Sequence, residues 1–145
     1  MKEDLNNRII DIVIMLKNGC IQREDSIREE FSVSPAEYRA ILAILPGEKT
    51  TGGSLSKKMG LSISRGSRII EKLMSKEYIK QVPTDKDRRC LMLMLTEKGI
   101  KLRKKIDNLL DKCEDEIKSR IPEVEMNDII NSLQKLTSIL NSNIN

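Results

Sequence analysis

The sequence predicts a mainly α-helical fold of the α+β class, in which one small β-hairpin accompanies several helices. Three observations support this prediction. Apolar residues recur at helical spacing over most of the 145 residues. Serine or threonine stands before several of these segments as an N-cap residue. Two short runs of strand type, Tyr78–Val82 and Cys90–Leu95, follow each other with the polar segment Pro83–Arg89 between them.

The N-terminal part of the chain predicts two helices. The first is expected from about residue 4 to Gly19, where a glycine suits a C-terminal cap, and a weaker helical stretch over 22–30 continues it. Its apolar positions at helical spacing are Leu5, Ile9, Ile12, Val13 and Leu16. The segment Ser34-Pro35-Ala36-Glu37 combines an N-cap serine, a proline at the first helical position and a capping-box glutamate. It predicts a helix over about 35–45 that Pro46-Gly47 stops.

The middle of the chain predicts two short helices and the hairpin. Thr51 caps a helix that runs through Met59, and Gly60-Leu61-Ser62 then turns the chain. Ser62 caps a further helix whose expected buried face consists of Ile63, Ile69, Ile70 and Leu73. Two helices joined by a three-residue turn with a glycine are typical of a helix-turn-helix. With the hairpin after it, the order of elements is that of a winged helix.

The C-terminal part predicts two long amphipathic helices. Thr96 caps the first, which keeps one apolar stripe until Pro122, and the second follows. The stripe of the first consists of Ile106, Leu109, Leu110, Cys113, Ile117 and Ile121, and that of the second of Met126, Ile129, Ile130, Leu133, Leu136 and Leu140. These stripes need a partner, and a second copy of the chain is the simplest one. We therefore expect one integrated domain, with 1–34 and 100–145 as a helical dimerisation region and 35–99 as a winged helix-turn-helix lobe that binds DNA.

The composition argues against several classes of function. The chain has no histidine, and its three cysteines have no CxxC spacing, so we expect neither an enzyme nor a metal or other cofactor. One Phe, two Tyr and no Trp are too few for stacking on single-stranded bases, so a nucleic-acid partner is expected to be a duplex. The longest apolar run, Leu91–Leu95, is too short to span a membrane, and the acidic, polar start is unlike a signal peptide. A cytoplasmic location is therefore expected.

Charge is distributed unevenly along the chain. Residues 57–105 contain fifteen Lys and Arg against five Asp and Glu, a local net charge of +10, and the remainder carries −6. A basic middle with acidic ends is expected of a protein with one surface that faces a polyanion. Solvated helix faces would give the same count.

The expected recognition helix carries the main candidate residues. Such a helix places the residues near its N-terminus at base edges in the major groove, and later basic residues meet phosphates. The candidates are Ser62, Ser64, Arg65, Ser67, Arg68 and Lys72. In the wing they are Lys86, Asp87, Arg88 and Arg89, because a guanidinium suits a narrow minor groove and Asp87 can hold Arg89 extended. The alternatives are a solvated face on the helix and an Asp–Arg pair that only stabilises the turn.

Over essentially its whole length the sequence resembles the MarR/SlyA family of winged-helix transcription regulators. The most specific stretch is residues 87–99, Asp-Arg-Arg followed by a hydrophobic strand and Leu-Thr-Glu-Lys-Gly, and Gly60-Leu61-Ser62 with Ser64, Ser67 and Arg68 resembles the family's turn and recognition helix. Gly66, where the family usually has an apolar residue, Glu77, where a glycine commonly ends the recognition helix, and Gly53-Ser54 depart from the pattern; they bear on the stability of this module.

The resemblance implies a homodimeric regulator, a repressor, that binds a pseudo-palindromic operator in double-stranded DNA and uses Arg89 as the minor-groove arginine. It also implies a small-molecule effector, which the sequence does not identify. Two alternatives stay open. One is a winged-helix module that docks an acidic partner protein. The other is a thiol-based redox-sensing regulator that uses Cys20, Cys90 or Cys113, although the apolar stripe around Cys113 favours a core position for that residue.

Overall fold

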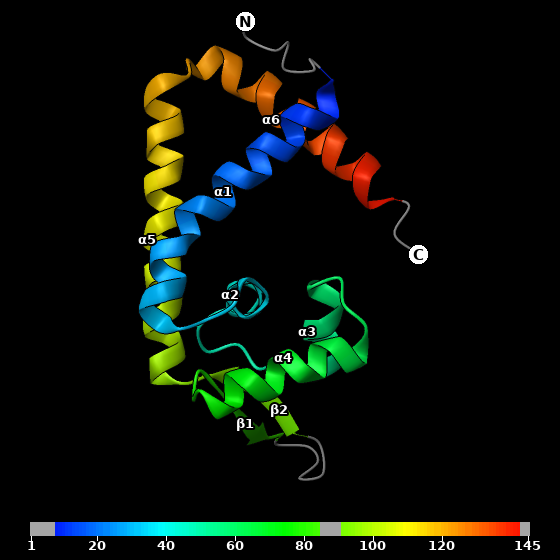
Figure 1. Cartoon of the computed structure of the whole chain (residues 1–145), viewed down its shortest axis with the longest axis vertical. Helices are drawn as coiled ribbons and strands as arrows, with labels where there is room; N and C mark the ends of the chain where they lie inside the picture. Colours follow the sequence, from blue (N-terminus) through cyan, green and yellow to red (C-terminus); the bar gives the residue numbers. More distant parts are fainter. Residues whose placement is uncertain (1–7, 85–90, 143–145) are drawn as a thin grey trace, which may run out of the picture. The chain divides into compact units, whose positions relative to one another are not determined.

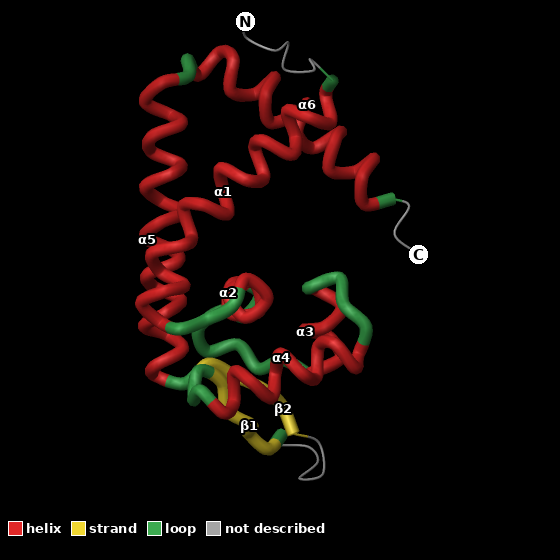
Figure 2. Tube along the Cα trace, in the orientation of Figure 1, coloured by secondary structure: helices red, strands yellow, loops and turns green. Residues whose placement is uncertain are grey.

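The computed structural model describes residues 8–84 and 91–142, and it confirms a mainly helical chain with one small antiparallel sheet (Figure 1, Figure 2). The chain divides into two compact units, residues 1–107 and 108–145. The elements, in order, are α1 (Ile9–Phe31), α2 (Pro35–Leu42), α3 (Gly52–Lys58), α4 (Ile63–Ser75), β1 (Ile79–Pro83), β2 (Leu91–Leu95), α5 (Glu97–Arg120) and α6 (Glu123–Asn141). The predicted division into a dimerisation region and a DNA-binding lobe stays a prediction.

Helix α1 is one continuous helix, so the predicted C-terminal cap at Gly19 is wrong, whereas the predicted continuation over 22–30 is confirmed. Gly19 lies inside the helix on an open surface, since a Cβ there would meet nothing within 4 Å. One glycine costs a helix only about 1 kcal/mol, and the polar stretch that follows carries enough helix-forming residues to continue it. The helix ends at Ser32, which has a left-handed backbone with φ 53°. Its amide and that of Val33 bond back to the carbonyls of Glu29 and Arg28.

Helix α2 begins at the predicted capping box. The Ser34 hydroxyl accepts from the Glu37 amide at 3.1 Å, and the Glu37 carboxylate accepts from the Ser34 amide at 3.2 Å. The helix ends at Leu42, earlier than predicted, because Pro46 has no N–H to donate to the Leu42 carbonyl. Arg103 of α5 donates to that oxygen instead, at 2.8 Å.

Arg103 is a buried residue whose side chain donates hydrogen bonds to backbone carbonyls at the C-terminal end of α2. Arg103 is only 8% exposed, and its Nη1 also donates to the Ile44 carbonyl at 2.8 Å. Its Nε donates to Asp107 at 2.9 Å. One guanidinium thus donates to the Ile41 and Leu42 carbonyls at the end of α2 and to the Ile44 carbonyl in the loop after it, and it fixes the start of α5 against them.

The core of the first unit is contributed by α2, α3, α4, the sheet and the start of α5. Its largest fully buried apolar side chains are Tyr38, Ile41, Ile44, Leu55, Leu73, Leu95, Leu102 and Ile106. The helix contacts of α4 are to α3 and α2, and its C-terminal end leads into β1. The core therefore holds α4 by one side and leaves its other side at the surface.

The predicted hairpin is confirmed, with small shifts at its ends. Strands β1 and β2 are antiparallel, with Ile79 opposite Leu95 and Pro83 opposite Leu91. A third backbone segment, which the sequence did not reveal, pairs with β2: the amide of Thr50 donates to the Leu93 carbonyl at 2.9 Å, and the Leu93 amide donates to the Thr50 carbonyl at 2.7 Å. Thr50 directly precedes the N-cap of α3.

Helix α5 begins at the predicted Thr96 cap. The Thr96 hydroxyl accepts from the Gly99 amide at 3.0 Å and donates to the Glu77 carbonyl at 2.5 Å. A Cβ at Gly99 would stand 2.0 Å from the Tyr78 carbonyl oxygen. The structure thus explains the threonine and the glycine of the Leu-Thr-x-x-Gly segment. The threonine caps α5, and the glycine lets α5 lie directly against the backbone that connects α4 to β1.

The second unit consists of the later part of α5 and helix α6. Helix α6 has no buried residue, and Leu110, Ile117, Ile130, Leu133, Ile139 and Leu140 are all more than 40% exposed. Cys113, expected in the core, is half-buried. Both predicted helices are present, but within this unit their apolar stripes are incompletely covered.

A strained residue follows the end of helix α4. Glu77 has a φ of 64°, and its amide and that of Tyr78 bond back to the carbonyls of Met74 and Leu73, an arrangement in which the left-handed position usually holds glycine. We expect Glu77→Gly to raise the free energy of unfolding by about 1 kcal/mol, since a left-handed backbone costs a non-glycine residue about that much. Urea unfolding measures the change.

The matched control is Glu71→Gly, which places glycine in the exposed interior of the same helix. It should lower stability by about 1 kcal/mol. Equal effects of the two substitutions would contradict the strain at Glu77.

Candidate nucleic-acid interface

Helices α3 and α4 form the predicted helix-turn-helix (Figure 1), and both predicted caps are in place. The Thr51 hydroxyl accepts from the Ser54 amide at 3.0 Å, and the Ser62 hydroxyl accepts from the Arg65 amide at 3.3 Å. Gly60 turns the chain with a φ of 68°, and the next amide, that of Leu61, donates to the Ser56 carbonyl at 2.9 Å. The turn is therefore bonded to the helix that precedes it.

Gly66 brings the two helices into direct contact. It is buried, and a Cβ there would lie 1.8 Å from the Ser56 Oγ and 2.6 Å from the Ser56 Cβ. The Ser56 hydroxyl is held in place, because it donates to the Gly52 carbonyl at 2.7 Å. The glycine that departs from the family pattern is thus paired with a small residue on α3, and the pair sets the distance between the two helices.

All six candidate residues of the recognition helix are exposed: Ser62, Ser64, Arg65, Ser67, Arg68 and Lys72. The buried face of α4 consists of Gly66, Ile70 and Leu73, and Ile69 is half-buried. The expectation that Ile63 is buried is wrong, since its side chain is 73% exposed. The helical period matches, but Ile63 lies in the first turn, beyond the part of α4 that contacts the core.

The +10 stretch is not one uniform basic face. Among its described residues, four cations are in ion pairs: Lys58 with Glu48 at 3.1 Å, Lys76 with Glu37 at 2.7 Å, Arg103 with Asp107 at 2.9 Å and Lys105 with Glu30 at 3.8 Å. Within residues 8–84 and 91–142, no ion pair engages Arg65, Arg68 or Lys72. The cations on the exposed side of α4 therefore remain available to a polyanion, whereas several others hold the fold together.

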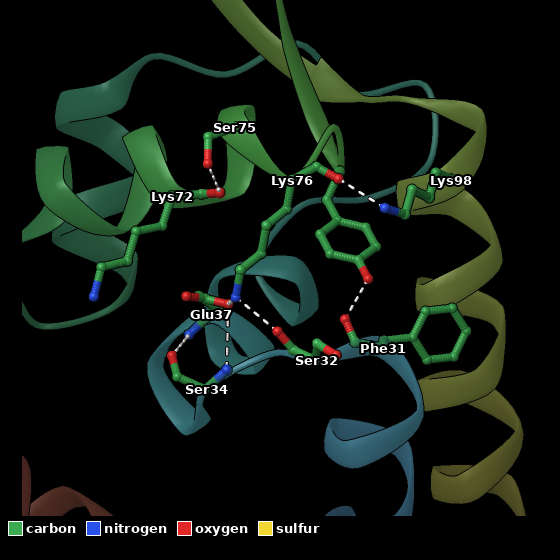
Figure 3. A network of polar contacts seen from close by, with 9 residues as sticks. Phe31, Ser32, Ser34, Glu37, Lys72, Ser75, Lys76 and Lys98 are labelled. Carbon is green, nitrogen blue, oxygen red and sulfur yellow. Dashed lines mark hydrogen bonds and ion pairs between the residues drawn. The ribbon is translucent and has the colours of Figure 1, made fainter.

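A polar network fixes the C-terminal end of α4 (Figure 3). The Lys76 ammonium donates to the Glu37 carboxylate at 2.7 Å and to the Ser32 carbonyl at 2.6 Å. Glu37 is 2% exposed and also closes the capping box of α2, so one carboxylate serves both helices. Lys76 thereby ties the end of the recognition helix to the junction of α1 and α2.

Two further contacts complete the network (Figure 3). The Tyr78 hydroxyl donates to the Phe31 carbonyl at 2.5 Å, and the Lys98 ammonium donates to the Lys76 carbonyl at 2.9 Å while it lies 4.6 Å from the centre of the Tyr78 ring. Burial raises the pKa of the Tyr78 hydroxyl, and the charge of Glu37 raises it further, so this group remains a donor. No local sequence signal indicates these contacts, which join residues twenty or more positions apart.

The wing residues Lys86, Asp87, Arg88 and Arg89, together with Cys90, lie outside the described residues. The hairpin that carries them is described up to Thr84 and again from Leu91. Of the other cysteines, Cys20 is exposed. Within the part of the chain that the structure describes, no group of three or more His, Cys, Asp or Glu is placed to hold a metal ion, and no helix is long and apolar enough to cross a membrane.

Comparison with known proteins gives the same fold. Over 134 residues, 92% of this chain and 89% of the relative, the sequence is 27% identical to the HTH-type transcriptional regulator SarZ of Staphylococcus aureus. Streptococcus pneumoniae FabT in complex with DNA matches with a TM-score of 0.79 at 22% identity, over 90% of this chain and 93% of that one. The S. aureus MepR–DNA complex matches with a TM-score of 0.65 at 22% identity, over 88% and 96%. No protein-family profile matches the chain.

The helix-turn-helix, the wing strands and these relatives together define a transcription regulator with a winged-helix DNA-binding fold. Its relatives are regulators and not enzymes, which agrees with the prediction that the chain is no enzyme. The resemblance predicted from the wing and turn motifs is confirmed, because these relatives and structural neighbours are winged-helix regulators of the MarR type.

Proposed function

We propose that the chain is a homodimeric repressor that binds a pseudo-palindromic operator in double-stranded DNA. The observation that carries this proposal is the exposed side of α4, where Arg65, Arg68 and Lys72 are exposed and make no ion pair within the described residues. The first turns of α4 supply the base contacts, and Lys72, further along the helix, meets phosphate. Both helices of the motif are capped and packed, so these side chains start from a fixed backbone.

The wing supplies the second contact in this proposal. Arg89 enters the minor groove next to the half-site, and Asp87 holds its guanidinium extended by a charge-assisted hydrogen bond. Lys86 and Arg88 add phosphate contacts. The support here is the sequence pattern and the position of the hairpin directly after the recognition helix.

A second copy of the chain covers the terminal helices. On α1, Ile9, Ile12 and Leu16 are each more than 50% exposed, and on α6 an apolar groove is lined by Ile130, Leu133, Gln134, Thr137 and Ser138. Helices with such faces are typical of a symmetric interface. In a dimer the two recognition helices meet successive major grooves when they lie about 34 to 36 Å apart. A small-molecule effector that favours another spacing shifts the population away from DNA binding.

DNA recognition is tested with an operator selected from random duplexes and competed against variants of each base pair. We expect Arg65→Ala or Arg68→Ala to cost about 1 to 3 kcal/mol at one operator position and to relax the preference there. Arg89→Ala should instead weaken binding to many sequences alike, since the minor groove carries a degenerate code. For the wild type, log affinity should fall steeply with log salt concentration.

Lys101→Ala is the matched control, because Lys101 is an exposed cation of the same basic stretch on a different helix. It should leave operator preference unchanged. A chain that binds all duplexes equally, or none, would contradict the proposal and favour the module that docks an acidic protein.

The dimer is tested on the groove of α6. We expect Leu133→Asp to shift the mass measured by light scattering toward the 16.6 kDa of one chain, because a buried, unpaired carboxylate at the interface is costly. Asn131→Asp, which adds the same charge at an exposed polar position of α6, should leave the dimer intact. A wild-type monomer at micromolar concentration would overturn the dimer proposal.

A further inference from the structure

The first residue of α4 is an exposed isoleucine that the fold does not use. Ile63 is 73% exposed, and the buried face of the helix begins at Gly66. A β-branched residue also gives little stability to the start of a helix. Neither local nor tertiary stability accounts for isoleucine here, and positions at which a local rule is broken without a stabilising gain are expected at functional sites.

Ile63 has a hydroxyl as its neighbour on the helix surface. Ser67 follows it by four residues and is also exposed, and residues four apart on a helix have their Cβ atoms about 5 to 6 Å from each other. The other hydroxyls of this turn are engaged locally: the Ser62 Oγ caps the helix, and the Ser64 Oγ lies 3.3 Å from it. The start of α4 thus presents the apolar side chain of Ile63 beside the hydroxyl of Ser67. Within the described residues, the Ser67 hydroxyl makes neither a capping contact nor a contact with another serine.

This pair matches one base edge in the major groove. Thymine presents a methyl group on C5 next to the O4 acceptor, whereas cytosine presents an amino donor and no methyl group. We propose that Ile63 and Ser67 together recognise a thymine in each half-site, with Ile63 covering the methyl group and the Ser67 hydroxyl donating to O4. This inference rests on the proposed function, since it requires α4 to enter the major groove.

The test replaces single thymines of the selected operator by deoxyuridine, which removes only the methyl group. At one thymine of each half-site, wild-type affinity should fall about fourfold, the factor that corresponds to the burial of one methyl group. Ile63→Ala should bind the two operators equally. Ser67→Ala should bind both more weakly and keep the fourfold ratio, because the methyl contact remains.

Leu45→Ala is the control, since Leu45 is an apolar side chain with 58% exposure that lies in the loop after α2. It should show the wild-type ratio at every thymine. If Ile63→Ala also keeps the wild-type ratio at every thymine, the inference is overturned while the proposed function stands. If no sequence is selected over random duplex, the proposed function fails as well, so the two failures are distinguishable.

Discussion

Gly66→Ala should lower the free energy of unfolding by about 2 kcal/mol. The added methyl group would stand 1.8 Å from the Ser56 Oγ and 2.6 Å from its Cβ, so α3 and α4 must move apart. Overpacking of this kind costs about 1 to 3 kcal/mol. Since the contact is close, we take the upper end, about 3 kcal/mol, and subtract the roughly 1 kcal/mol by which alanine favours the helix over glycine. Because the same contact sets the position of the recognition helix, operator affinity should fall as well. Urea unfolding and DNA binding measure the two effects.

Two further variants separate this contact from a general effect of alanine. Gly53→Ala lies in α3 of the same motif, where a Cβ would meet nothing within 4 Å, so it should be neutral or stabilising by up to about 1 kcal/mol. Ser56→Gly removes both side-chain atoms nearest to the new methyl group, and in the double variant it should recover much of the loss. Additive losses in the double variant would mean that the contact at Gly66 is not the cause.

Arg103→Leu should cost about 3 kcal/mol of stability. The leucine cannot donate to the carbonyls of Leu42 and Ile44, and each buried acceptor without a donor costs about 1 to 3 kcal/mol. Since Pro46 offers no amide to Leu42, the backbone itself has no replacement donor at that carbonyl. Thermal or urea unfolding measures the loss.

The neighbouring Lys104→Leu is the control, because Lys104 is an exposed cation one position further along α5. Its effect should stay within about 0.5 kcal/mol. Asp107→Asn should have a smaller effect than Arg103→Leu, since the Asp107 side chain is 42% exposed. A loss at Arg103 no larger than that at Lys104 would contradict its role at the end of α2.

The caps, the helix-turn-helix and the hairpin were predictable because their signals are local. A serine or threonine before an apolar period, or a glycine in a three-residue turn, determines the conformation of the residues next to it, and Ser34, Thr51, Ser62 and Thr96 all cap as predicted. The exposure of the candidate residues of α4 was predictable for the same reason. The apolar period marks the buried face of the helix, and these residues lie away from that face.

The remaining features depend on contacts between distant segments. Nothing near Arg103 in the sequence distinguishes it from the exposed lysines around it, yet it lies in the core and ends a helix about sixty positions earlier. In the sequence, Lys76 is likewise indistinguishable from the other cations of the basic stretch. Only the folded chain brings it into an ion pair with Glu37. Ile63 was assigned to the core because its spacing fits the period, but the buried face of α4 begins only at Gly66, and Ile63 is exposed.

The pairing of Thr50 with Leu93 determines which residues must be moved together when the DNA-binding part of this protein is exchanged with that of a relative. Its two backbone hydrogen bonds join the residue before α3 to the second wing strand, across the whole helix-turn-helix. The strand β2 is therefore bonded on both edges, to β1 and to Thr50. A chimaera that exchanges DNA specificity between relatives must therefore carry residues 50 to 99 as one block. A junction between α4 and the wing would take Thr50 from one parent and β2 from the other, and these two segments would then have to pair although they come from different proteins.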